Sequence, residues 1–201
     1  MAPKIHPHQL SSNNSINSSQ EREKYTIWMK SLVFSSNGCT IYDSNGNLAY
    51  RIDNYDTKCS SQVFLMDLKG NILCTLLRKK LRLREQWNGY TCDKVKKVKP
   101  WFQVKKKNIF LNKENGFSCQ VTIGGDKSQA TSCFKIQGCS RKSEFKIFRG
   151  DGALAAELKR KQSIGGVMLG NDVLSLEMVA NMDHSFIISL VVVHGLMLHK
   201  I

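Results

Sequence analysis

The chain has 201 residues, enough for one domain or one domain with a tail, and 41% of them are hydrophobic. That share can fill a core that needs neither disulfides nor a structural metal. Thirty Lys and Arg against sixteen Asp and Glu give a net charge of +14, which favours anionic partners such as nucleic acid or acidic lipid. The N-terminus has no apolar stretch to act as a signal peptide, so we expect an intracellular protein that is not secreted.

Residues 1–24 are rich in Ser and Asn and hold almost no apolar side chains. A segment with so little to bury is typical of disorder. We therefore expect a disordered leader over residues 1–24 and a single domain over residues 25–201.

From residue 25 onward, short apolar segments alternate with turn sequences. Three turns share one chemistry: Asp-Ser-Asn-Gly-Asn at 43–47, Asp-Leu-Lys-Gly-Asn at 67–71 and Arg-Gly-Asp-Gly at 149–152. The glycine can take the positive φ that a tight hairpin needs, so these turns predict three β-hairpins. Further strands are predicted at 27–34, 102–105, 117–123, 131–136, 166–169 and 173–178. Such regular spacing predicts a mainly β fold, either a barrel or a sandwich.

The last segment, residues 185–198, is apolar on nearly every side and follows Asp183, a suitable helix N-cap. A helix that is apolar all round must be surrounded by protein or lipid. The run is shorter than the about 20 apolar residues that a membrane span needs, so we expect a buried core helix and no transmembrane segment. The Val triplet at 191–193 would also suit a strand.

No motif points to an enzyme, a metal site or a cofactor. Seven cysteines form no CxxC pair and have no histidine nearby, which predicts free thiols in a reducing compartment. The glycines near residue 165 do not fit a dinucleotide motif, and there is no P-loop. The consecutive Asp, His and Ser at 183–185 cannot form a catalytic relay as sequence neighbours. We expect a non-enzymatic protein without catalytic residues.

Three segments resemble the plant LURP-one-related family, which belongs to the tubby C-terminal-like and phospholipid scramblase-like superfamily. They are Thr-Ile-Tyr-Asp-Ser-Asn-Gly-Asn-Leu-Ala-Tyr-Arg-Ile-Asp-Asn-Tyr at 40–55, Val-Phe-Leu-Met-Asp-Leu-Lys-Gly-Asn-Ile-Leu at 63–73, and Gly-Asn-Asp-Val-Leu-Ser-Leu-Glu at 170–177, followed by the apolar tail. The resemblance spans residues 25–201. It implies a tubby-like antiparallel barrel of about twelve strands that encloses a hydrophobic C-terminal helix. It also implies a link to plant defence, to membrane tethering or to transcription, and no catalysis.

The strongest functional feature is basic: residues 78–107 hold twelve Lys and Arg against two acids. If 78–84 is one extended strand, Lys80, Arg82 and Arg84 share a face while leucines fill the other. Near an anionic leaflet each such cation contributes about 1 kcal/mol. The predicted site for anionic lipid or phosphate is Arg78, Lys79, Lys80, Arg82, Arg84, Lys96, Lys97 and Lys99, with 105–107 adding to the field. The competing interpretation is a solvated face that only keeps the protein soluble.

Two other functions are possible predictions from the sequence. One uses the same cations, and the other does not depend on them. A nucleus-linked regulator that binds DNA or RNA would need aromatic platforms for bases, and Trp87, Tyr90, Trp101 and Phe102 lie among the lysines. A scaffold that binds only proteins would leave the charge incidental. The favoured hypothesis is a monomer in the cytoplasm that docks peripherally on acidic membrane lipid, with unknown protein partners.

Overall fold

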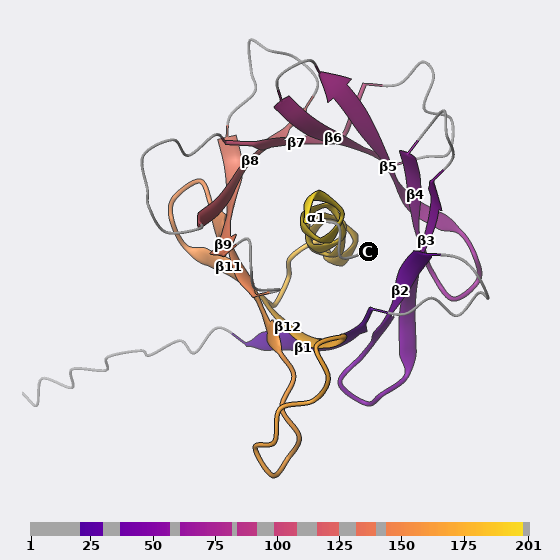
Figure 1. Cartoon of the computed structure of the whole chain (residues 1–201), viewed down its shortest axis with the longest axis vertical. Coiled ribbons are helices and arrows are strands. Elements are labelled where there is room, and N and C mark those ends of the chain that lie inside the picture. Colours follow the sequence, from indigo (N-terminus) through magenta and orange to yellow (C-terminus); the bar gives the residue numbers. More distant parts are fainter. Residues whose placement is uncertain are drawn as a thin grey trace, which may run out of the picture.

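Each strand of the computed structural model pairs with the strands before and after it in sequence, and β1 pairs with β12 to close an antiparallel barrel (Figure 1). The structure describes residues 21–29, 37–56, 61–81, 84–91, 99–107, 116–124, 132–139 and 144–198. The elements are β1 (Arg22–Trp28), β2 (Asn37–Tyr42), β3 (Leu48–Asp56), β4 (Ser61–Met66), β5 (Ile72–Leu81), β6 (Arg84–Tyr90), β7 (Phe102–Lys106), β8 (Gly116–Ile123), β9 (Ser132–Cys139), β10 (Phe145–Arg149), β11 (Leu154–Arg160), β12 (Val173–Val179) and α1 (His184–Met197). The predicted barrel is confirmed.

The three predicted hairpins join β2 to β3, β4 to β5 and β10 to β11. In the first, Asp43 Oδ1 accepts hydrogen bonds from the backbone N–H groups two and four residues ahead, at 2.9 and 2.8 Å. Asp67 repeats this arrangement in the second, with the same two distances. The turn glycines Gly46, Gly70 and Gly152 have φ values of 82°, 80° and 86°, a region that glycine enters without strain.

The predicted elements differ from the structure in several places. β1 begins at Arg22, so residues 22–24, which were assigned to the leader, belong to the first strand; residues 1–20 lie outside the described part. Of the strand predicted at 27–34, residues 27 and 28 form the end of β1, residue 29 follows that strand, and 30–34 are not described. The strand predicted at 166–169 is wrong, because this segment forms part of a hairpin held by a single bridge between Gln162 and Met168.

α1 occupies the centre of the barrel, viewed end-on in Figure 1. Every residue from Phe186 to Met197 is buried, which explains why the segment is apolar on all sides. Asp183 caps the helix, because its Oδ1 accepts a hydrogen bond from the Phe186 N–H at 3.0 Å. The helix therefore occupies the interior of the barrel, as predicted. Within the described part of the chain, no helix is long and apolar enough to cross a membrane.

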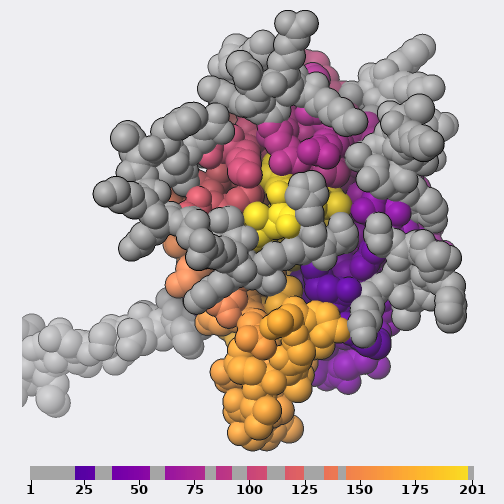
Figure 2. All heavy atoms as spheres, viewed as in Figure 1, coloured from indigo at the N-terminus to yellow at the C-terminus, as the bar shows by residue number. Residues whose placement is uncertain are grey.

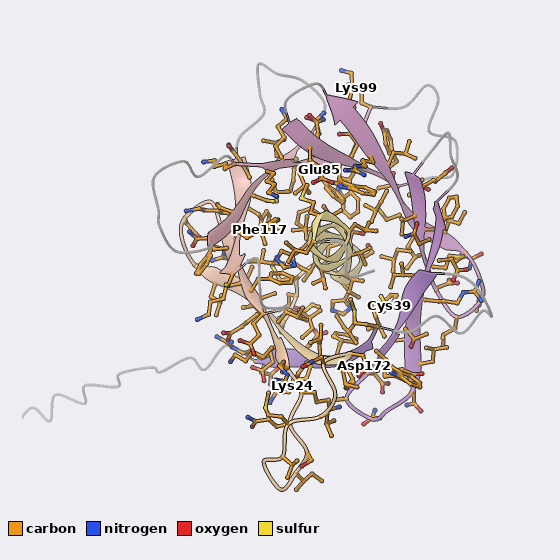
Figure 3. The ribbon with its side chains drawn as sticks, in the orientation of Figure 1. Lys24, Cys39, Glu85, Lys99, Phe117 and Asp172 are labelled. Atoms are coloured by element: carbon orange, nitrogen blue, oxygen red, sulfur yellow. The ribbon has the colours of Figure 1, made fainter. Side chains whose placement is uncertain are left out.

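Aromatic rings fix the helix against the inner wall. Phe186 lies 5.2 Å from Phe102 and 5.1 Å from Phe134, measured between ring centroids. Near the other end, the His194 ring lies 4.8 Å from Phe117 and 3.8 Å from Phe145. Figure 3 shows how densely side chains fill the space between helix and strands. Packing of this kind orients the helix as well as burying it.

The antiparallel order gives the barrel two distinct rims. All odd-numbered strands run in one direction, so their C-terminal ends form one rim and their N-terminal ends form the other. The chain leaves β12 at the second rim and enters α1 there. The helix then runs through the barrel and ends at the first rim, where its last turn is visible in the middle of Figure 2.

Candidate functional site

Three odd-numbered strands end in three consecutive cations. The sets are 78–80 in β5, 105–107 at the end of β7 and 159–161 at the end of β11. Because these strands run in the same direction, the three sets lie on the same rim, which we call the basic rim. The fold thus gathers cations that are up to about eighty residues apart in sequence.

The opposite rim carries aspartates, and we call it the aspartate rim. Asp43, Asp67 and Asp151 stand in three of its hairpin turns, and Asp183 caps the helix there. Hydrogen bonds that the turns donate to the first three carboxylates, chiefly from Asn47, Asn71 and Ala153 respectively, hold the pKa of each below 3.8. These aspartates therefore stay charged. Cations lie at this rim too, since Arg149 pairs with Asp151 at 3.1 Å and Lys69 stands in the second turn, so its charges are mixed. Runs of consecutive cations are found at the basic rim.

The strand register places three exposed lysine side chains in line on the outer wall, two of them from these sets and a third from β9. Lys79 pairs with Gln86, Gln86 with Lys105, Lys105 with Gln120, and Gln120 with Lys135. Directly paired residues share a face, so a glutamine lies between each lysine and the next. Neighbouring lysines of the row are therefore two strands, or about 10 Å, apart. We call Lys79, Lys105 and Lys135 the lysine row. None of the three forms an ion pair with an acid in the described ranges.

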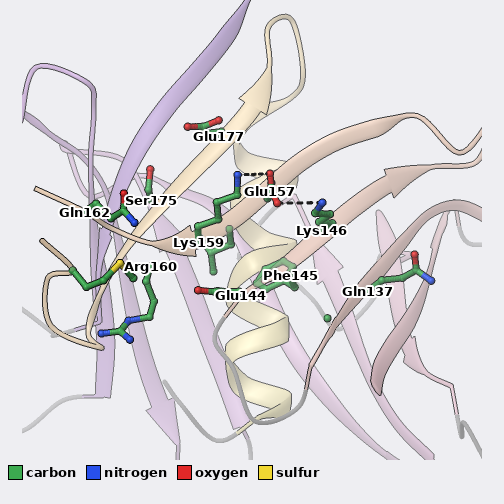
Figure 4. A pocket seen from close by; sticks show the side chains of 13 residues that line it. Gln137, Glu144, Phe145, Lys146, Glu157, Lys159, Arg160, Gln162, Ser175 and Glu177 are labelled. Atoms are coloured by element: carbon green, nitrogen blue, oxygen red, sulfur yellow. Dashed lines mark ion pairs between the residues drawn. The ribbon is translucent and has the colours of Figure 1, made fainter. Parts of the chain in front are cut away.

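Some of the rim cations are already neutralised by acids. Arg78 lies 3.1 Å from Glu85, and Lys159 lies 2.7 Å from Glu157. Glu157 also pairs with Lys146 at 3.4 Å, in a groove of about 560 Å³ on the outer face of β9 to β12 (Figure 4). The charges of that groove mostly satisfy one another. The lysine row therefore offers the freer positive charge.

The structure divides the predicted site. Arg78 and Lys79 are exposed on the basic rim, and the backbone places Lys80 and Arg84 there too. Lys99 lies at the opposite rim, just before β7 begins and beyond the Tyr90 end of β6. It is thus separated from Arg84 by the length of β6, roughly 20 Å. The other predicted residues, Arg82, Lys96 and Lys97, lie outside the described residues.

The single extended strand that was assumed for 78–84 does not form. β5 ends at Leu81 and β6 begins at Arg84 in the opposite direction, with these two residues paired. The side-chain alternation that put Lys80, Arg82 and Arg84 on one face holds only within a single strand. Sequence reasoning also missed Lys135 and the cations at 159–161. The signal that could have found the latter is three cations at the end of a predicted strand.

The aromatic side chains proposed as platforms for bases belong mostly to the core. Trp87, Tyr90 and Phe102 are buried. Trp101 packs against Phe186 with ring centroids 5.4 Å apart. Buried rings cannot stack on nucleic-acid bases, so this arrangement weighs against the nucleic-acid hypothesis.

The three residues at 183–185 turn to different partners. His184 Nε2 lies 2.6 Å from Glu23 Oε2 on β1, whereas Ser185 Oγ donates a hydrogen bond to Asp183 Oδ1 at 2.6 Å. The histidine thus contacts neither the serine nor the aspartate in the way a relay requires. In the part of the chain that the structure covers, no three His, Cys, Asp or Glu side chains gather in a way that could hold a metal ion.

Solved structures and curated proteins resemble the chain over most of its length. The X-ray structure of a protein from Arabidopsis thaliana shares the fold with a TM-score of 0.64 and 20% identity, over 89% of this chain and 92% of that one. Among relatives from the same plant, LURP-one-related 11 is 43% identical over 96% of this chain and 87% of its own length. LURP-one-related 3 is 44% identical over 88% and 80%.

A family model described as LURP-one-related matches residues 23–195, from the first strand to the last turns of the helix. The matched region thus includes all twelve strands almost completely, together with the core of α1. The chain belongs to the LURP-one-related family.

Proposed function

We propose that the protein is a non-enzymatic regulator that docks peripherally on acidic membrane lipid with its basic rim. The observation that carries this proposal is the separation of charge: cations end three strands at one rim, while aspartates occupy the turns of the other. Such a molecule is oriented by a negatively charged surface before it makes contact. The link to plant defence that the family resemblance implies is part of the same proposal.

The lysine row supports docking because its charges are exposed and are not paired with described acids. Each lysine close to an anionic leaflet contributes about 1 kcal/mol, so three give roughly 3 kcal/mol before orientation costs. This attraction decays within a Debye length of about 8 Å at physiological salt. Binding should therefore be reversible and sensitive to ionic strength.

Vesicle flotation tests the proposal. The protein is mixed with vesicles of phosphatidylcholine alone, and with vesicles that also contain phosphatidylserine or phosphatidylinositol bisphosphate. The expected result is flotation only with the anionic vesicles, and less of it as salt rises. Lys105→Glu should weaken binding, whereas Lys69→Glu, in a turn at the aspartate rim, is the matched control and should bind as the unaltered protein does.

Two results would contradict this function. The first is indifference to anionic vesicles at low salt. The second is a gel-shift assay in which DNA or RNA binds more tightly than the vesicles do, with the steep salt dependence of phosphate contacts. A partner protein captured equally well by the unaltered chain and by Lys105→Glu, with no vesicle binding, would favour a protein scaffold.

A further inference from the structure

Exposed apolar side chains are concentrated at one place on the barrel. The large hydrophobic residues exposed in the described part are Trp28, Leu68, Ile164, Val167 and Met168, and Ile164 among them is fully exposed. Three of them stand in the hairpin that joins β11 to β12, residues 161–172. Trp28 stands at its base, where it pairs with the first residue of β12. Only Leu68 lies elsewhere, at the aspartate rim.

The 161–172 hairpin holds its tip in a defined shape. Ser163 and Val167 are joined by a backbone hydrogen bond of 2.8 Å, and the Ser163 hydroxyl accepts a second one from the Val167 N–H at 3.2 Å. Gly166 supplies the positive φ of 78° that closes the turn. The hairpin extends beyond the barrel wall, at the bottom of Figures 1 and 2. Its aliphatic side chains are thus presented to the surroundings by an ordered turn.

The charged residues that flank the tip in sequence are of one sign. From residue 159 to residue 170 the sequence has three cations and no acid, and of these cations Lys159 pairs with Glu157. The acid that follows, Asp172, accepts a hydrogen bond from Trp28 Nε1 at 3.2 Å. An aliphatic tip above a cationic base, with a Trp ring at its foot, is complementary to a bilayer whose headgroups are anionic and whose interior is apolar.

We infer that the tip of the 161–172 hairpin, through Ile164, Val167 and Met168, inserts into the boundary between headgroups and acyl chains of an anionic lipid bilayer. This inference rests on the proposed function and adds a hydrophobic anchor to it. β11 ends at the basic rim, so the hairpin leaves the barrel at the rim that the lysines occupy. In strand order Lys105, on β7 at the middle of the lysine row, is four strands from β11, so the two contacts lie at separate places around the barrel.

The cations of the basic rim and the aliphatic tip contribute to binding in different ways. The lysines supply a salt-sensitive part of the binding, since exposed charges are screened. The aliphatic tip supplies a part of the binding that does not depend on salt, because the transfer of apolar side chains from water into the bilayer does not involve charge.

The test compares vesicle binding of Ile164→Ser/Val167→Ser with that of Leu68→Ser, a change of the same kind at the opposite rim. The vesicles contain phosphatidylcholine and phosphatidylserine. All three side chains are exposed, so the changes leave the core intact. We expect the hairpin variant to bind about tenfold more weakly, mainly through the part that survives high salt, and Leu68→Ser to bind as the unaltered protein does.

A second readout locates the tip directly. Ile164→Trp and Leu68→Trp are mixed with vesicles that contain brominated acyl chains, and quenching is compared with that of the unaltered protein, which already has Trp28. Added quenching at 164 but not at 68 supports insertion. Equal binding of the hairpin variant, or no added quenching at 164, overturns the inference while the lysine-row result leaves the proposed function standing. If the unaltered protein ignores anionic vesicles altogether, both fall.

Discussion

The guanidinium of Arg78 lies 3.1 Å from the carboxylate of Glu85, across the hairpin that joins β5 to β6. The same carboxylate accepts a hydrogen bond from Trp87 Nε1 at 3.4 Å, which ties the ion pair to a ring of the core. Both side chains of the pair remain partly exposed. Glu85 is therefore an acid within the basic rim, and it offsets one of the cations there.

Glu85→Gln should strengthen binding to anionic vesicles. The amide keeps the shape of the side chain and an acceptor for Trp87, but it leaves the charge of Arg78 uncompensated. A gain of about 1 kcal/mol corresponds to roughly fivefold tighter binding. Flotation at low salt measures the change. Asp151→Asn, which removes an acid from the aspartate rim, is the control; if it raised binding equally, only net charge would matter and the basic rim would have no special role.

The local pattern of the sequence was sufficient to predict most of the strands and turns of the fold. The three hairpins with an Asx residue and glycine were predicted because their turn chemistry is confined to five residues or fewer. The hairpin between β5 and β6 was missed because Leu-Arg-Leu-Arg at 81–84 has no such signal and alternates as a strand does. Its alternation led to one strand where the chain forms two.

The basic rim could not be predicted in the same way. Whether Lys79 and Lys105 share a surface depends on the direction and register of β5, β6 and β7, which no local pattern specifies. Lys99 shows the converse. It is closer to Lys105 in sequence than Lys79 is, but it lies at the opposite rim. The clustering of Lys and Arg in the sequence indicated an anionic partner, but it did not indicate which of these residues lie together in the structure.

The turn aspartates predict how stability responds to acid. Because the pKa of Asp43, Asp67 and Asp151 is lowered in the folded state, their stabilising contribution is present above the unfolded value near 3.8 and is lost as pH falls below it. Replacing all three by Asn, which suits the same turns, should flatten the acid side of the stability profile. Urea unfolding across that pH range measures this. An unchanged acid limb would show that other carboxyl groups control it.

Buried thiols predict a loss of stability in alkali. Burial raises the pKa of Cys39 and of Cys119 from 9.0 to about 12. Each therefore contributes stability that is fully present below pH 9.0 and that declines as pH rises towards 12, since the unfolded thiol ionises first. At about pH 10 the loss is on the order of 1 kcal/mol for each thiol.

The variant Cys39→Ala/Cys119→Ala tests this. It should be less stable than the unaltered protein near neutral pH, because two small cavities are left in the core. Its free energy of unfolding should then fall less steeply between neutral pH and about pH 10. Cys139→Ala, at a half-buried thiol, is the control. Parallel profiles for the double variant and the unaltered protein would exclude the thiols as the cause.

The close packing of a strand glycine against an aromatic ring predicts a large effect from one methyl group. A Cβ on Gly89 would overlap the ring of Phe102, the residue that packs against Phe186 of the helix. The ring has no free space, because Trp101 lies 5.4 Å from it on another side. Gly89→Ala should therefore cost about 1–3 kcal/mol of unfolding free energy, as overpacked cores do. Gly165→Ala, where the nearest atom is the Ser163 hydroxyl at 3.9 Å, should leave it nearly unchanged. Urea unfolding distinguishes the two, and a neutral Gly89→Ala would mean that α1 and the ring can shift together inside the barrel.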